Sequence, residues 1–287
     1  MEVKVLKPIG YCFGVVNAIS LALKVKNEFK DKNVKVLGYL VHNEEVVEYL
    51  NSKGIISIDT TNKNKEELIN SFVKDDIIIF TAHGHEEYLE NLLNERGIKY
   101  FDATCERVKK NIEVIKTNST RSIIYIGKKF HPETESALSY SKNVYLYDIK
   151  EGIDYSKIKQ NNPIVINQTT LSFLEIENIH KDILKNLPNA IIEDEICDAT
   201  RVRQQQIKEI EKIYDLIVVV GSNKSSNTEQ LYKIAKTHHK DSLVLKVNNY
   251  KELEKEDLSK CKRSLITSGT STPLETIENI KEYLRGI

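Results

Sequence analysis

Two patterns of apolar and polar positions alternate along the chain. Short apolar runs such as "DIIIF", "SIIYIG" and "LIVVVG" are typical of the buried strands of a parallel sheet. Between them lie longer stretches, such as "VVNAISLALKVKNEF" and "RVRQQQIKEIEKIY", in which apolar residues recur with the period of an amphipathic helix. Strands that alternate with helices favour parallel sheets joined by right-handed crossovers, so the pattern predicts an α/β protein.

The same order of elements occurs three times, and each copy begins at a cysteine. Cys12, Cys105 and Cys197 are separated by 93 and 92 residues, and each precedes a helical pattern, a strand, a polar turn and a second helix. Each copy closes on a β-rich run and a turn: "DIIIFTAHGHEE", "NPIVINQTTLS" and "RSLITSGTSTPLE". The repeat predicts three similar α/β sandwich lobes with parallel sheets, at residues 1–97, 98–189 and 190–287.

The polar turns all follow strands. In open parallel sheets the functional loops lie beyond the carboxyl ends of the strands. If the three lobes pack about a pseudo-threefold axis with these edges inward, the cysteines and turns of all three surround a central space. The repeat therefore predicts one shared site.

Composition narrows the class of protein. The 287-residue chain carries 42 Lys and Arg against 42 Asp and Glu, and this balance provides little of the positive field that nucleic-acid binders use. No signal-peptide pattern opens the sequence, and no apolar run approaches the roughly 18 residues of a membrane span. We expect a cytoplasmic protein that binds neither nucleic acid nor membrane. Its thiols would stay reduced, so its cysteines are candidate metal ligands or reactive groups.

Three thiolates that meet at one point can hold an iron–sulfur cluster, and a four-iron cubane would keep one iron without a protein ligand. The alternative is three buried, inert cysteines, which the shared position in the repeat disfavours. Cys261 precedes a strand and is expected to be structural. "CDATRVR" also has the C-x5-R spacing of cysteine phosphatases, but Ile196 stands where those enzymes carry His, and Arg203 falls inside a helical pattern.

The polar turns contribute mostly neutral hydrogen-bond donors near the starts of predicted helices, where free N–H groups and the helix dipole favour an anion. Ser, Thr and Asn are also ordinary N-caps, so each alone is compatible with a structural role. Converging on one space, they would fit a diphosphate. The carboxyl of Glu133, beside His131, is a candidate proton donor. The candidate residues are His42, His83, His131, Glu133, Thr169, Ser225, Ser226, Asn227 and Ser271.

Nine motifs, in order along nearly the whole chain, resemble the LytB/IspH family of (E)-4-hydroxy-3-methylbut-2-enyl diphosphate reductases. They are "GYCFGV", "VHNEEVV", "AHGH", "DATC", "KKFHPE", "NQTTLS", "IC" with "ATRVRQ", "GSNKSSNT" and "SGTSTP". The family more often has Ala at the position of Phe13, Pro at that of Glu106 and "AGAST" in place of "SGTSTP". None of these differences removes a candidate ligand or proton donor.

The resemblance implies a [4Fe–4S] cluster on Cys12, Cys105 and Cys197. It implies that two electrons and two protons remove an allylic hydroxyl, which gives isopentenyl and dimethylallyl diphosphate. The electrons would come from a small electron-transfer protein of the ferredoxin or flavodoxin type. Glu133 would be the proton source, with Thr169 and His131 beside it. The diphosphate would contact His42, His83, Ser225, Ser226, Asn227 and Ser271, and His131 would also line the substrate pocket. A redox sensor of the same fold and a cysteine phosphatase are the competing interpretations.

Overall fold

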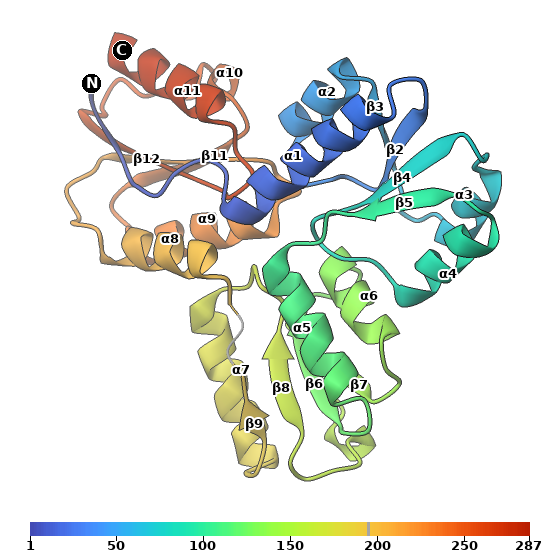
Figure 1. The fold of residues 1–287 in the computed structure, drawn as a ribbon. Coiled ribbons are helices and arrows are strands. Elements are labelled where there is room, and N and C mark those ends of the chain that lie inside the picture. The colour runs from blue at the N-terminus through green and yellow to red at the C-terminus, as the bar shows by residue number, and fades with distance from the viewer. Residues whose placement is uncertain (194–195) are drawn as a thin grey trace. The chain divides into compact units, whose positions relative to one another are not determined.

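The structure, a computed structural model, describes residues 1–193 and 196–287 and contains three four-stranded sheets (Figure 1). The chain divides into two compact units. The first unit comprises residues 1–15, 42–46 and 197–287, and the second comprises residues 16–41 and 47–196. Every strand pairing within the three sheets is parallel, which confirms the predicted α/β class with three parallel-sheet lobes.

The first unit contains one sheet with the strand order β1-β12-β10-β11. Its strands are β1 (Glu2–Val5), β10 (Leu216–Val220), β11 (Leu243–Val247) and β12 (Arg263–Ser268). Its helices are α8 (Asp198–Glu209), α9 (Ser226–His238), α10 (Tyr250–Leu253) and α11 (Leu274–Gly286).

The second unit contains two sheets. One has the order β3-β2-β4-β5 and the other β7-β6-β8-β9. The strands are β2 (Asn33–Leu37), β3 (Ile55–Ile58), β4 (Asp76–Phe80), β5 (Lys99–Asp102), β6 (Ile123–Gly127), β7 (Val144–Asp148), β8 (Ile164–Asn167) and β9 (Ile191–Ile192).

The helices of the second unit connect these strands. They are α1 (Phe13–Glu28), α2 (Glu44–Ser52), α3 (Lys65–Ser71), α4 (Glu87–Glu95), α5 (Glu106–Thr117), α6 (Pro132–Ser139), the 3₁₀ helix η1 (Tyr155–Lys157) and α7 (Phe173–Asn186). The first three residues of α1 and of α2 belong to the first unit. Among the described residues, no helix combines the length and apolar character that crossing a membrane requires.

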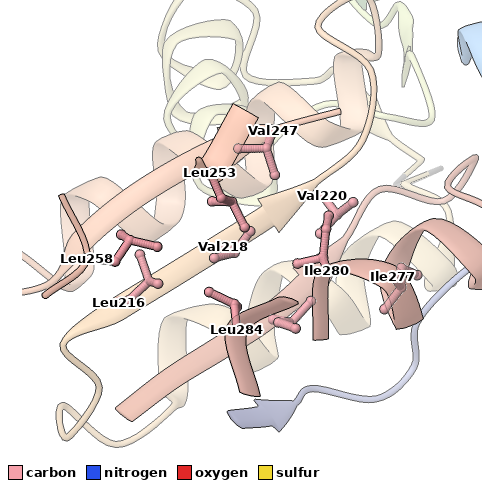
Figure 2. Packing of buried hydrophobic residues seen from close by; sticks show 10 residues of the cluster. Leu216, Val218, Val220, Val247, Leu253, Leu258, Ile277, Ile280 and Leu284 are labelled. Atoms are coloured by element: carbon pink, nitrogen blue, oxygen red, sulfur yellow. The ribbon is translucent and has the colours of Figure 1, made fainter. Parts of the chain in front are cut away.

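One core cluster of the first unit lies between its sheet and α11 (Figure 2). Leu216, Val218 and Val220 alternate along β10, so that one face of the strand presents only apolar side chains. Ile277, Ile280 and Leu284 recur at helical spacing on α11 and are buried in the same cluster. This packing fixes the carboxyl ends of β10 and β12, from which the polar turns of the unit extend.

Replacing Leu216 by alanine should lower the free energy of unfolding by about 2–5 kcal/mol, because a fully buried side chain is lost and leaves a cavity. Chemical denaturation of the full chain measures this loss. Leu243 provides a matched control, since it pairs with Leu216 in the register of β10 and β11 but is 39% exposed. Equal losses at the two positions would contradict this description of the core.

The strand before each cysteine belongs to the sheet of the preceding copy of the repeat. β5 pairs with β4, β9 pairs with β8, and β1 pairs with β12 at the other end of the chain. The predicted ranges 1–97, 98–189 and 190–287 therefore separate these three strands from their sheets. A local pattern shows that a strand forms, but it does not show with which distant strand it pairs. The assignment of these three ranges as separate domains stays a prediction.

Candidate active site

The three cysteines of the repeat occupy equivalent positions. Cys105 and Cys197 are the N-cap residues of α5 and α8, and Cys12 immediately precedes α1. Neither Cys105 nor Cys197 uses its side chain to cap its helix, and none of the four cysteines forms a disulfide. Thiols at such positions are chemically suited to act as iron ligands. Cys261 instead precedes the amino end of β12 and packs against the core cluster, as expected for a structural residue.

The backbone at Cys12 and Cys105 is held by neighbouring turns. The N–H of Cys12 donates to the carbonyl of Thr270 at 2.9 Å, and the N–H of Cys105 donates to that of Ala82 at 3.0 Å. Cys12 and Cys197 belong to the first unit and Cys105 to the second. The meeting of all three sulfurs at one point therefore stays a prediction. Among the described residues, no group of three His, Cys, Asp or Glu side chains is arranged to hold a metal ion.

The first unit brings together five of the predicted diphosphate ligands. β10 and β12 are neighbours, so the turns that follow them lie side by side, and the Oγ1 of Thr272 donates to the carbonyl of Val220 at 3.0 Å. Ser271 donates its hydroxyl to the carbonyl of His42 at 3.3 Å. The remaining three of the set, Ser225, Ser226 and Asn227, are at the start of α9.

Two observations at the start of α9 separate a binding role from a capping role. The hydroxyl of Ser225 accepts the N–H of Thr228 at 3.3 Å, which is ordinary N-cap geometry. Asn227 differs, because the residue is 2% exposed and neither its amide nitrogen nor its amide oxygen has a hydrogen-bond partner in the described part of the chain. A buried amide without partners is costly, so this side chain is suited to bind a ligand.

The second unit holds the predicted proton donor. His131 caps α6 by accepting the N–H of Glu133 on Nδ1 at 3.2 Å, and its ring lies edge-on to that of His83, 5.8 Å between centroids. Since β6 and β8 are neighbours, the turn after β8 places Thr169 beside Glu133. Thr169 donates its N–H to Oε1 at 2.8 Å and its hydroxyl to Oε2 at 3.1 Å. The structure therefore brings Glu133, Thr169 and His131 together.

Burial controls the acidity of Glu133. Its side chain is 2% exposed, and loss of solvation raises its pKa to about 7 from the ordinary value of 4.5. The hydrogen bonds from Thr169 and from the hydroxyl of Tyr125, which donates to Oε1 at 3.2 Å, act in the opposite direction. Oε1 already accepts two hydrogen bonds, so the acidic proton is best placed on Oε2. In this protonated form Oε2–H donates to the Thr169 hydroxyl, whereas the ionised carboxylate accepts from it. Near neutral pH this carboxyl can both hold and release a proton.

The raised pKa of Glu133 predicts a pH dependence of stability. Below pH 4.5 the group is protonated in both folded and unfolded chains. Between 4.5 and about 7 the unfolded chain releases the proton while the folded chain keeps it, so the free energy of unfolding falls as the pH rises. Chemical denaturation of the metal-free protein across this pH range should show this decline in the free energy of unfolding. Glu133→Gln should make the decline smaller. Glu135→Gln, which alters a half-exposed side chain on the same helix, should leave the decline unchanged.

Two residues near these sites were not recognised from the sequence as part of them. Tyr125 belongs to the buried strand "SIIYIG", where it is the only residue with a hydroxyl besides Ser122. Arg203 shares a buried face of α8 with Thr200 and Ile207. For Arg203, the signal available in the sequence was a charged residue at a position where the helical pattern predicts an apolar one. Its guanidinium donates to the backbone carbonyls of Gly10 and Ser268, which argues against the phosphatase interpretation, because that chemistry needs the arginine for phosphate.

Known proteins similar to this chain share one activity in their names. The chain is 32% identical over 288 residues to a 4-hydroxy-3-methylbut-2-enyl diphosphate reductase of Shouchella clausii, an alignment that covers 99% of the chain and 90% of the relative. A reductase of the same name from Fusobacterium nucleatum is 35% identical over 294 residues, and the chain spans about a third (34%) of that longer relative.

Solved structures agree with the fold. The structure of (E)-4-hydroxy-3-methyl-but-2-enyl diphosphate reductase, described as the terminal enzyme of the non-mevalonate pathway, superposes with a TM-score of 0.69 at 26% identity and covers all of both chains. The corresponding reductase of Plasmodium falciparum gives 0.85 at 23% identity, covering 99% of this chain and 87% of its own, and so supports the fold. The family described as LytB protein matches residues 3–285, and this chain belongs to it.

Proposed function

We propose that the chain is a 4-hydroxy-3-methylbut-2-enyl diphosphate reductase, which uses two electrons and two protons to remove the allylic hydroxyl as water and gives isopentenyl and dimethylallyl diphosphate. The observation that supports this best within the site is the buried carboxyl of Glu133, which has a pKa of about 7 and is hydrogen-bonded to Thr169. Cleavage of an allylic C–O bond needs such a proton donor, because hydroxide is a poor leaving group. The names of the relatives supply the substrate and the pathway.

Cys12, Cys105 and Cys197 would hold a [4Fe–4S] cluster, which when bound supplies electrons and an iron that has no protein ligand. The three residues fit this group in donor chemistry and in their equivalent positions before helices. A small electron-transfer protein of the ferredoxin or flavodoxin type would supply the electrons. We place the protein in the cytoplasm, where thiol ligands stay reduced.

The chain's own groups would bind the substrate and move the proton. Ser225, Ser226, Asn227, Ser271 and His42 would bind the diphosphate in the first unit, and the unpartnered amide of Asn227 is the strongest support for this assignment. His83 would contribute from the second unit. Glu133 would pass the proton on Oε2 to the Thr169 hydroxyl, and this hydroxyl would hand its own proton to the departing oxygen.

Anaerobic purification followed by iron and sulfide analysis tests the proposal. We expect a brown protein that absorbs near 400 nm and turns over the allylic diphosphate with a chemically reduced dye. A protein that holds the cluster without turnover would be a redox sensor. A colourless protein that hydrolyses phosphate esters without iron would be a phosphatase. Either result would exclude the reductase.

A further inference from the structure

Arg203 is a buried cation of the first unit. Its side chain lies on α8 and the residue is 2% exposed. No Asp or Glu among the described residues forms an ion pair with it. A buried charge is costly unless an opposite charge compensates it. Burial lowers the pKa of Arg203, and negative charge on Cys12 and Cys197 acts in the opposite direction. When these two cysteines are thiolates, as iron ligands must be, they would therefore act as counter-charges for Arg203.

The guanidinium also connects the segments that carry these cysteines. Nη2 donates to the carbonyl of Gly10 at 2.7 Å, two residues before Cys12. Nη1 donates to the carbonyl of Ser268, the last residue of β12, at 2.9 Å. The N–H of Gly10 donates to the hydroxyl of Ser268 at 3.0 Å and closes the contact. Since Cys197 is the N-cap residue of α8, this one side chain ties the Cys12 segment to the helix that follows Cys197.

The Nε–H of Arg203 is an available donor. The Nε atom is buried and has no hydrogen-bond partner among the described residues. Backbone carbonyls use only two of the five N–H groups of the side chain, so the Nε–H leaves hydrogen-bonding capacity for a group that the protein itself does not provide.

We propose that Arg203 is a positioning residue for the cluster: it holds Cys12 and Cys197 in fixed relation and places a buried positive charge beside both ligands. The proposal rests on the cluster ligation in the proposed function, but not on the identity of the substrate. Reduction adds negative charge to a cluster, and a nearby cation in a medium of low dielectric constant favours the reduced form. Arg203 should therefore raise the reduction potential.

The test compares the loaded wild-type protein with Arg203→Met, Arg203→Lys and the control Arg263→Gln. Arg263 lies at the amino end of the same strand whose carboxyl end Arg203 contacts, and it is half-exposed. In Arg203→Met we expect the equilibrium constant for one-electron reduction to fall at least tenfold, a shift of about 59 mV to more negative potential. The reduction potential of Arg203→Lys should stay close to that of wild type. Both should release iron to a chelator faster than wild type, and Arg263→Gln should match wild type in both measurements.

Wild-type potential and wild-type iron release in Arg203→Met would overturn the proposal. If Arg203→Met takes up no iron, the result for Arg203→Lys is used instead. A reduction potential near that of wild type together with faster iron release in Arg203→Lys supports the positioning role. If neither variant loads, unfolding of the metal-free chains decides. Folding like wild type supports the positioning role, and failure to fold overturns it in favour of a general structural role. A wild-type protein that binds no cluster would instead refute the proposed function.

Discussion

Glu133→Gln should lower turnover about 10²–10⁴-fold, the usual contribution of general acid catalysis, with electron donor in excess. The amide has nearly the same shape and can keep hydrogen bonds to Thr169, but it cannot deliver a proton to the departing oxygen. Iron content and binding of the diphosphate substrate should stay at wild-type values, because neither depends on that proton. Single-turnover assays with reduced protein measure the effect directly.

Glu135→Gln is the matched control for this variant. Glu135 lies two residues away on α6, and its side chain is 39% exposed, with Lys65 as an ion-pair partner at 3.5 Å. Turnover should be unchanged in this variant. If Glu133→Gln kept more than about a third of wild-type turnover, general acid catalysis by this carboxyl would be too small to matter. Proton delivery would then have to be reassigned to His131 or to ordered water.

The pairing of Glu133 with Thr169 shows what the sequence could predict. Both follow strands, and both fall in polar turns of the second copy of the repeat. Because β6 and β8 are neighbours in a parallel sheet, the turns after them lie at one edge. The pattern placed both turns at the carboxyl ends of strands, and the resemblance to the family implied that Thr169 lies beside Glu133. In the first unit, the turns that contain Ser225 and Ser271 likewise follow two neighbouring strands, β10 and β12.

The role of Arg203 shows where that reasoning ends. Its position six residues after Cys197 suggested only the spacing found in cysteine phosphatases. Its place in a helical pattern argued against the phosphatase interpretation. Its partners are backbone carbonyls at Gly10 and Ser268, distant in sequence and invisible to any local pattern. Tyr125 is similar, since an aromatic residue in an apolar strand predicts core packing and not a hydrogen bond to the acid. Contacts of this kind need the tertiary structure.

Replacing Cys12, Cys105 or Cys197 by serine should remove or degrade the cluster, because a hydroxyl is a poor iron ligand compared with a thiolate. Iron and sulfide analysis after anaerobic purification, together with the absorbance near 400 nm, measures the loss. The three positions are equivalent in the repeat, so the three variants should behave alike.

Cys261→Ser is the internal control, with the same change of one atom in the same chain. Cys261 lies before the amino end of β12, the opposite end of the strand from Ser268 and the turn that contains Ser271, and it packs against apolar residues of the core cluster. Burial raises the pKa of this thiol, which keeps it protonated and makes it a poor ligand. Full iron content is therefore expected. Loss of iron equal to that of the other three variants would show that position relative to the strands does not identify the ligands.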